Sequence, residues 1–206
     1  EGEEIAIGAM TSKRAAEDSA LIKARQPLFH AATRLIGHLP VRNRGTVGGS
    51  FAHADPAAEY PAVALAQDLQ MKAQGPNGTR LIAAQDFFVT FMTTSLEASE
   101  VLTEVRLPAM KAGTGWSIQE FTRRAGDLAL TGAVATLRKV NGLCQDTRIC
   151  AFGVSATAMR FPAAEALLNG KAPTAENFAR AASLASESVE EPIGDIHATP
   201  EYRRHL

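Results

Sequence analysis

The dipeptide Asn141-Gly142 is the feature of this 206-residue chain that most constrains its fold. Strand-like runs flank it on both sides, residues 129–139 before it and residues 144–155 after it. Because Asn and Gly both tolerate the positive φ angles of a type I′ turn, the dipeptide predicts a tight antiparallel hairpin. Another strand-like run, residues 116–123, precedes the hairpin. The second half of the chain should therefore contain a group of three strands.

Elsewhere the sequence shows signals for helices and for a second hairpin. Ser12 can cap a helix that begins at Lys13, and Pro27 suits the first turn of another helix. Thr174 can cap a helix late in the chain. Residues 75–78, Gly-Pro-Asn-Gly, predict the turn of a hairpin in the first half.

A strand pattern over residues 101–107 ends at Pro108. Its alternation predicts that Val101 and Val105 lie on one face of the strand and Leu102 on the other. The segment after Pro108 has the composition of a linker, so we expect a domain boundary there and divide the chain into residues 1–110 and 111–206. The order of the elements predicts an α+β fold with two subdomains.

Charge and cysteine content exclude several classes of protein. The chain has 21 Lys and Arg against 22 Asp and Glu, which argues against a nucleic-acid partner or an anionic membrane surface, since both require a basic excess. No apolar run approaches the roughly 20 residues of a membrane span. Cys144 and Cys150 are too few to hold a zinc ion or an iron–sulfur cluster. In a strand they would share one face, and two reduced thiols fit a cytoplasmic protein.

A glycine pair lies in the segment "RNRGTVGGSFAHADPAAEYP", residues 42–61. Glycine lets a backbone approach an anion and point successive N–H groups at it, and the hydroxyls of Thr46 and Ser50 add donors. The core "TVGGS" matches neither the Walker A loop nor the dinucleotide fingerprint, so a plain surface turn is the alternative. We expect this segment to be a loop as far as Pro56.

The charged side chains around the glycine pair also have alternatives. Arg42 and Arg44 could contact phosphate, but loop arginines are more often solvated. His53, Asp55 and Glu59 could form a metal or acid–base cluster, although a metal site needs a defined geometry. Asp55, which precedes a proline, also suits the N-cap of a helix, and we favour that interpretation. Glu59 would then lie near the start of this helix, on the side of the glycine pair.

Several longer segments together carry a resemblance to a known family. "VRNRGTVGGSFAHADPAAEYPAVALA" closely resembles the flavin-binding (medium) subunit of molybdenum hydroxylases, such as the carbon monoxide dehydrogenase medium subunit and the flavin domain of xanthine dehydrogenase. The resemblance continues through "FFVTFMTTSLEASEVLTEVRLP" and "QEFTRRAGDLAL" to "GDIHATPEYRRHL". It implies an FAD-binding domain of the vanillyl-alcohol-oxidase (PCMH) type, followed by a C-terminal domain of three antiparallel strands and a helical bundle.

The resemblance also implies which residues face the cofactor. Residues 46–50 correspond to the second of two FAD loops, and Glu59 falls where relatives have Asp. Gln119 falls where one branch has Lys, and Leu128 where relatives often have an aromatic residue. The first FAD loop has no match, so we expect a subunit truncated at both ends. The positions implied to contact FAD are Ile36, Thr46, Val47, Gly48, Gly49, Ser50, Asp55, Glu59, Leu102 and Gln119.

The function implied is electron transfer within a complex. A large partner subunit would oxidise the substrate at molybdopterin, and a small partner subunit would pass the electrons through [2Fe–2S] clusters to FAD. The acceptor would be NAD⁺, oxygen or a quinone. No side chain of this chain is expected to act as acid, base or nucleophile. Two alternatives are a flavin-free module that assembles the same complex and a stand-alone FAD oxidase of the same fold.

Overall fold

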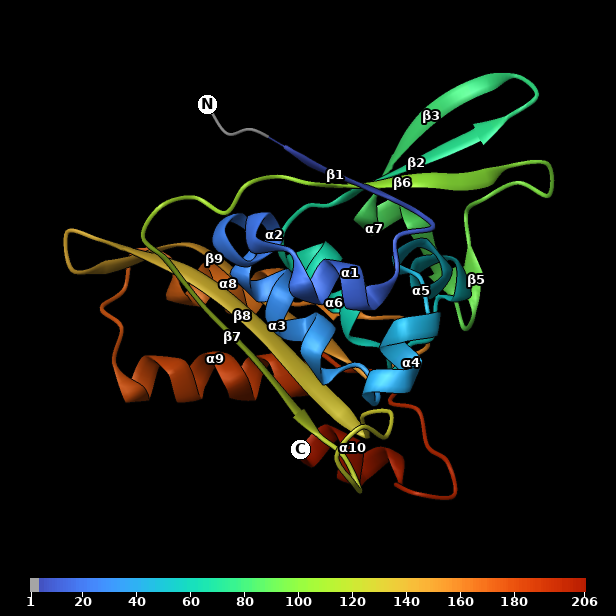
Figure 1. The fold of residues 1–206 in the computed structure, drawn as a ribbon. Coiled ribbons are helices and arrows are strands. Elements are labelled where there is room, and N and C mark those ends of the chain that lie inside the picture. Colours follow the sequence, from blue (N-terminus) through green and yellow to red (C-terminus); the bar gives the residue numbers. More distant parts are fainter. Residues whose placement is uncertain (1–3) are drawn as a thin grey trace.

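The first sheet of the protein carries the N-terminal strand and the hairpin of the first half. A computed structural model describes residues 4–206. In this sheet, four antiparallel strands occur in the order β1-β6-β2-β3 (Figure 1). The turn at residues 75–78 joins β2 to β3, which confirms the predicted hairpin. The strands are β1 (Ile5–Gly8), β2 (Gln70–Gly75), β3 (Gly78–Ala83) and β6 (Val101–Leu107).

The second sheet contains the three strands expected in the second half. Its order is β10-β9-β8-β7, with every pair antiparallel. Asn141 and Gly142 have φ angles of 51° and 81°, the positive values that the predicted type I′ turn requires. The strands are β7 (Thr114–Phe121), β8 (Thr131–Val140), β9 (Leu143–Phe152) and β10 (Met159–Arg160).

A group of short helices fills the space between the two sheets (Figure 1). The predicted helix cap at Ser12 and the predicted place of Pro27 in a first turn are confirmed, since Ser12 accepts a hydrogen bond from the Ala15 N–H and Pro27 occupies the first helical position. α6 packs on β8 and β9 and is almost entirely buried. The elements are α1 (Lys13–Asp18), α2 (Ala20–Arg25), α3 (Pro27–Leu35), α4 (Leu39–Arg44), α5 (Val47–His53), α6 (Glu59–Ala66), α7 (Ala84–Phe87), β4 (Phe88–Thr90) and β5 (Thr93–Thr94).

Helices α8 (Pro162–Leu168) and α9 (Ala175–Glu187) pack against each other, and α8 also packs on β9. Thr174 caps α9 through the Asn177 N–H, as predicted. The final helix, α10 (Pro200–His205), is anchored by the buried side chain of Arg203. Its guanidinium donates to the carbonyls of Leu130 and Gly153 and pairs with Asp195 at 2.7 Å.

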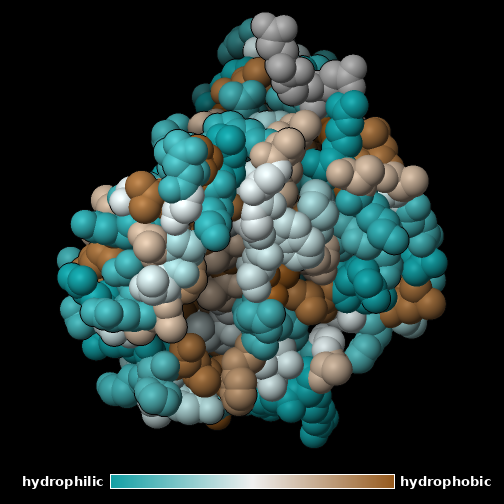
Figure 2. All heavy atoms as spheres, turned by 90° about the vertical axis from the view of Figure 1, so that its left-hand side faces the viewer, coloured by the Kyte–Doolittle hydropathy of each residue, from teal (hydrophilic) through white to brown (hydrophobic). Residues whose placement is uncertain are grey.

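One apolar core runs through both halves of the chain. Ile118, Val134 and Phe152 from the second sheet belong to the same buried cluster as the helices of the first half. The division at residue 110 therefore stays a prediction. None of the helices in residues 4–206 combines the length and the apolar character that crossing a membrane requires. The face seen in Figure 2 carries hydrophobic residues only in small groups among hydrophilic ones.

A β-bulge makes the predicted alternation of β6 wrong. Lys72 pairs with Glu104, but Ala73 pairs with Leu102, so β6 carries one extra residue. That extra residue reverses the alternation on its N-terminal side. Val101 is consequently 65% exposed and Leu102 only 6%, on the same side as the buried Val105.

A second bulge separates the two cysteines. Thr136 pairs with Arg148 while Arg138 pairs with Gln145, so β9 also carries an extra residue, and Asp146 there has a φ of 50°. Both thiols are free and buried, but Cys144 belongs to the cluster beneath α8 and α9 and Cys150 to the main core. The expectation that they share one face is wrong for this reason.

Candidate functional site

The glycine pair lies in a helix and not in the loop that the sequence predicts. α4 and α5 occupy most of residues 39–53. Thr46 is the N-cap of α5, and its hydroxyl oxygen accepts a hydrogen bond from the Gly49 N–H at 3.0 Å. Glycine disfavours a helix interior by about 1 kcal/mol relative to alanine. This helix must therefore be stabilised by tertiary contacts that sequence patterns do not show.

Those contacts come from the segment between β1 and α1. The Val47 N–H donates to the Thr11 carbonyl and the Gly48 N–H to the Ala9 carbonyl, both at 2.8 Å. A Cβ atom on Gly48 would lie 2.4 Å from the Cβ of Ala9, far inside van der Waals contact. Glycine at position 48 is thus required by the packing of α5 on this segment.

These bonds decide which donors the segment can offer to a cofactor. The N–H groups of Val47, Gly48 and Gly49 already have protein acceptors, so they do not form a row of donors for a phosphate. The Thr46 hydroxyl accepts a bond but keeps its own proton to donate. Ser50, half-buried one turn further on, adds a second hydroxyl. The segment suits a phosphate-bearing cofactor through hydroxyl groups.

Asp55 is not a helix cap, contrary to the preferred prediction. Its carboxylate accepts a hydrogen bond from the Ala57 N–H at 2.8 Å, which closes a local turn. α6 begins later, at Glu59, with Ala58 as its N-cap. Residues 4–206 contain no group of three or more His, Cys, Asp and Glu side chains placed to hold a metal ion, so the metal alternative gains no support.

Glu59 is buried at the first position of α6, with 4% of its surface exposed. Burial raises the pKa of its carboxyl to about 7, and the nearby carboxyl of Glu120 adds to the rise. Lys13, at the start of α1, has the opposite effect on the pKa of Glu59. Lys13 is itself 9% exposed, and burial lowers the pKa of its ammonium group while Glu59 opposes that change.

Strand β7 turns the side chain of Glu120, and not that of Gln119, toward Glu59. Ile118 is buried against the core and Gln119 is exposed. Because alternate residues of a strand face the same side, Glu120 faces inward with Ile118. Burial raises the pKa of Glu120, and its Oε2 atom is buried with no hydrogen-bond partner. The apolar Ile118 two residues earlier was the sequence signal that could have identified Glu120.

Three of the other expected positions are buried in the main apolar core. Val47, Ile36 and Leu102 belong to one buried cluster, and α5 packs against β1 and β6. Leu128 is 60% exposed and lines a pocket of about 340 Å³ together with Asp55 and Phe91. The structure therefore buries Val47, Ile36 and Leu102 in the main core, whereas Leu128 and Gln119 are exposed.

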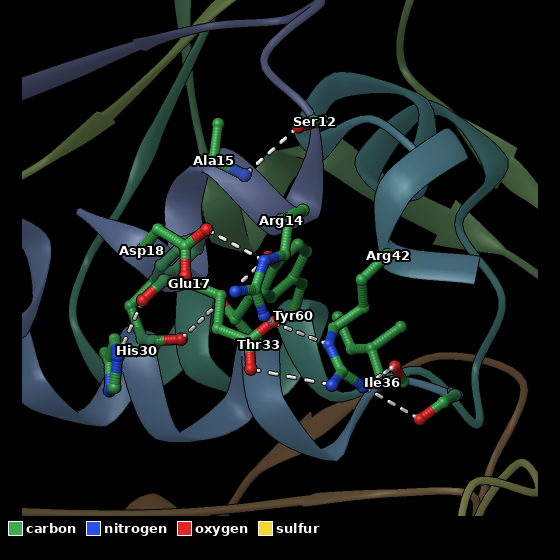
Figure 3. Close-up of polar contacts among 12 residues, drawn as sticks. Ser12, Arg14, Ala15, Glu17, Asp18, His30, Thr33, Ile36, Arg42 and Tyr60 are labelled. Carbon is green, nitrogen blue, oxygen red and sulfur yellow. Dashed lines mark hydrogen bonds and ion pairs between the residues drawn. The ribbon is translucent and has the colours of Figure 1, made fainter. Parts of the chain in front are cut away.

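Arg42 fixes the position of α4 behind this site (Figure 3). Its guanidinium donates to the Glu17 carboxylate at 2.9 Å and to the carbonyls of Ile36 and Gly37 at 3.1 and 3.0 Å. Although burial alone would raise it, the pKa of Glu17 is lowered because Arg42 bonds to and attracts the carboxylate. The interpretation of Arg42 as a solvated side chain is wrong, whereas Arg44 is exposed.

The chain matches family models over most of its length. Residues 1–110 match the FAD binding domain in molybdopterin dehydrogenase, and residues 116–206 match the CO dehydrogenase flavoprotein C-terminal domain. The chain belongs to the family of FAD-binding subunits of molybdenum hydroxylases. The α+β fold and the family resemblance expected from the sequence are thereby confirmed.

Individual relatives extend over the whole chain. The carbon monoxide dehydrogenase medium chain of Hydrogenophaga pseudoflava is 37% identical over 203 residues, which are 98% of this chain and 70% of that protein. The nicotine 6-hydroxylase medium subunit of Paenarthrobacter nicotinovorans is 38% identical over 205 residues, covering 100% of this chain and 71% of that protein. A structure of the Hydrogenophaga carbon monoxide dehydrogenase superimposes with a TM-score of 0.95 at 40% identity, covering 100% of this chain and 71% of that one.

Proposed function

We propose that this chain is the electron-transfer flavoprotein subunit of a molybdenum-containing dehydrogenase. The chain would hold an FAD, and the bound cofactor would supply the redox chemistry that links the [2Fe–2S] clusters of a small partner subunit to an acceptor such as NAD⁺, oxygen or a quinone. A large partner subunit with molybdopterin oxidises the substrate. The two free, buried cysteines suit a reducing compartment, so we place the complex in the cytoplasm. The proposal rests on the way α5 docks on residues 9–11 beside the buried Glu59. This arrangement occurs in a chain that matches FAD-binding relatives throughout.

In this proposal the protein binds and orients the cofactor, and FAD supplies the redox chemistry when it is bound. The hydroxyl groups of Thr46 and Ser50 would hold the phosphate groups, with the Thr46 hydroxyl as a donor, and Glu59 would offer its buried carboxyl to a hydroxyl or N–H group of the cofactor. No proton transfer by a side chain is needed.

The second candidate is a flavin-free module that assembles the complex. The observation in its favour is that the N–H groups of residues 47–49 already bond acceptors within the chain, so α5 leaves no row of backbone donors for a phosphate. A visible spectrum and a cofactor analysis of the native complex separate the two candidates. A flavin band that follows this subunit supports the first, and a complex without flavin supports the second.

The role of the Thr46 hydroxyl can be tested by substitution in the same complex. Thr46→Val removes the hydroxyl and the cap of α5 but keeps the shape of the side chain. Thr174→Val is the matched control, since Thr174 caps α9 through the same type of bond, at 3.3 Å, far from the site. We expect only Thr46→Val to lose FAD during dialysis. Equal FAD retention in the two variants would remove Thr46 from the binding site.

A further inference from the structure

A cavity of about 170 Å³ lies where the segment after β6 meets the second sheet and the end of α6. Three cationic side chains from three elements converge on it: Lys111 from that segment, Arg138 from β8 and Arg148 from β9. The carboxylates of Asp68 and Asp146 also line it, so its lining has one positive charge in excess. None of the lining residues is among the positions expected to contact FAD, and the cavity is therefore not part of the site described above.

The cations of this cavity have more donors than the protein has acceptors for. Lys111 and Arg138 both donate to the same oxygen atom, Oδ2 of Asp146, at 3.2 and 3.1 Å. Within residues 4–206, the bonds that Arg148 donates are 3.3 and 3.4 Å long, both beyond the usual range, and the shorter one goes to Asp68. A guanidinium group has five N–H donors and an ammonium group three. Most of this donor capacity is therefore left for water or for a ligand.

The floor of the cavity adds a buried donor and a buried hydroxyl. The Nε atom of Arg148 is buried and has no hydrogen-bond partner in the part of the chain that the structure describes. Thr136 lies opposite Arg148 in the β8–β9 pair, is only 3% exposed and lines the same cavity. Since a buried polar group without a partner is rare in a folded protein, the surroundings of Arg148 point to a missing acceptor.

The bulge in β9 places an internal anion at the cations. Asp146 lies in this bulge with a φ of 50°, and bulges often redirect a side chain beside a functional site. The pKa of its carboxyl is lowered because Arg138 and Lys111 bond to it, so the group is charged at neutral pH. Its side chain is half exposed and uses one oxygen for both cations. A ligand with more acceptor oxygens can therefore replace it.

The donors define the chemistry of that ligand. It must be an anion, because three of the four donating side chains are cations. The planar guanidinium group matches the oxygens of a carboxylate or a phosphate. A carboxylate has only two oxygens, whereas a phosphate presents three to donors from several directions. Beside the cations, residues 108–110 (Pro-Ala-Met) form a wall with apolar side chains that can face a small organic group.

We propose that this cavity binds a phosphate group, either free or as the monoester of a small molecule, through Lys111, Arg138 and Arg148. The bound phosphate replaces Asp146 as the acceptor for Lys111 and Arg138 and gives Arg148 the acceptor that it lacks. It thereby ties the segment after β6 to strands β8 and β9. The site goes beyond the proposed function and does not depend on it.

The test uses the full-length protein in its native complex, with its cofactors bound. Isothermal titration calorimetry measures the binding of inorganic phosphate and of phenyl phosphate to the wild type, to Arg138→Met and to Lys111→Met. Arg180→Met and Lys171→Met, at exposed positions on the C-terminal side, are the matched controls. The visible spectrum is recorded during the titration, because release of flavin would show that the probe enters the cofactor site and would overturn the proposal.

We expect Arg138→Met and Lys111→Met each to weaken phosphate binding about tenfold, as for the loss of one charge-assisted hydrogen bond. The two controls should bind both probes as the wild type does. Tighter binding of phenyl phosphate than of inorganic phosphate would identify a monoester as the ligand of this site, and equal binding would identify free phosphate. A wild type that binds neither probe, or an Arg138→Met variant that binds both as tightly as the wild type, would overturn the proposal.

Asp146→Asn separates a phosphate site from a purely structural ion pair. Asparagine tolerates the positive φ of this position, so the bulge is retained while the competing negative charge is removed. A phosphate site should bind its probe several-fold more tightly in this variant. If Asp146 serves only to hold Lys111 and Arg138 in place, the affinity would stay unchanged or fall, and the proposal would be refuted.

Discussion

Replacing Gly48 by alanine tests whether this glycine serves packing. The new methyl group would lie 2.4 Å from the Cβ of Ala9 and 2.8 Å from its carbonyl oxygen. Both atoms belong to the segment that anchors α5. An ordinary contact requires about 3.5–4.0 Å, so α5 and this segment must move apart by about 1 Å. That movement strains the bond between the Gly48 N–H and the Ala9 carbonyl, which is 2.8 Å long.

The magnitude follows from three opposing contributions. Overpacking a close contact costs about 1–3 kcal/mol. Losing a backbone hydrogen bond costs about 1 kcal/mol. The better helix propensity of alanine returns about 1 kcal/mol. We therefore expect Gly48→Ala to lower the free energy of unfolding by about 1–3 kcal/mol.

Gly49→Ala is the matched control, one residue away in the same helix. Its methyl group would lie 2.7 Å from the Thr46 hydroxyl oxygen, but that is a side-chain atom which can rotate away. The loss of the capping bond, about 1 kcal/mol, is offset by helix propensity, so the net change should be near zero. Urea denaturation of the FAD-free subunit, followed by circular dichroism, measures both variants. If Gly49→Ala destabilises the subunit as much as Gly48→Ala, the packing argument is refuted.

Three further outcomes follow from buried groups. Burial raises the pKa of Glu59 from 4.5 to about 7, so the contribution of this carboxyl to the stability of the FAD-free subunit is fully present below pH 4.5 and is lost as pH rises through 7. In the wild type this loss lowers the free energy of unfolding by roughly 3 kcal/mol, and Glu59→Gln should abolish it. Denaturation of both proteins at pH 5 and pH 8 would show the difference. Arg203→Met should lower the free energy of unfolding by about 2–4 kcal/mol because it leaves the buried carbonyl oxygens of Leu130 and Gly153 without their charged donor, while the exposed control Arg180→Met should change it little. Cys144 and Cys150 should resist alkylation in the native subunit and react once it unfolds, since both are buried and burial raises the pKa of Cys150 strongly; mass spectrometry of labelled protein measures this.

Features that depend on a few neighbouring residues could be predicted from the sequence. The hairpin at Asn141-Gly142 and the caps at Ser12 and Thr174 depend on local backbone preferences, and each is present. The bulges in β6 and β9 could not be predicted, because they depend on how two strands pair and not on either strand alone. A single inserted residue then reversed the expected exposure of Val101 and Leu102.

The site shows the same distinction between local and tertiary information. The resemblance implies Gln119 as a cofactor contact, which stays a prediction; the side chain that β7 turns toward Glu59 is that of Glu120, because the buried Ile118 sets the orientation of the strand. α5 was missed because its stability comes from hydrogen bonds to Ala9 and Thr11, some 37 residues earlier in the chain. No pattern within residues 42–56 contains that information.

The position of α5 explains why one short motif can suggest a phosphate cradle and still lack its donors. Glycine permits close backbone approach to any neighbour, and here the neighbour of Gly48 is the backbone of Ala9. That packing occupies the N–H groups of Val47 and Gly48, while the Thr46 hydroxyl keeps a proton that it can donate. In the proposed function, recognition of the cofactor would depend on the hydroxyl groups of Thr46 and Ser50 and on the carboxyl group of Glu59. Thr46→Val should therefore affect flavin binding, whereas Gly48→Ala should act first on stability.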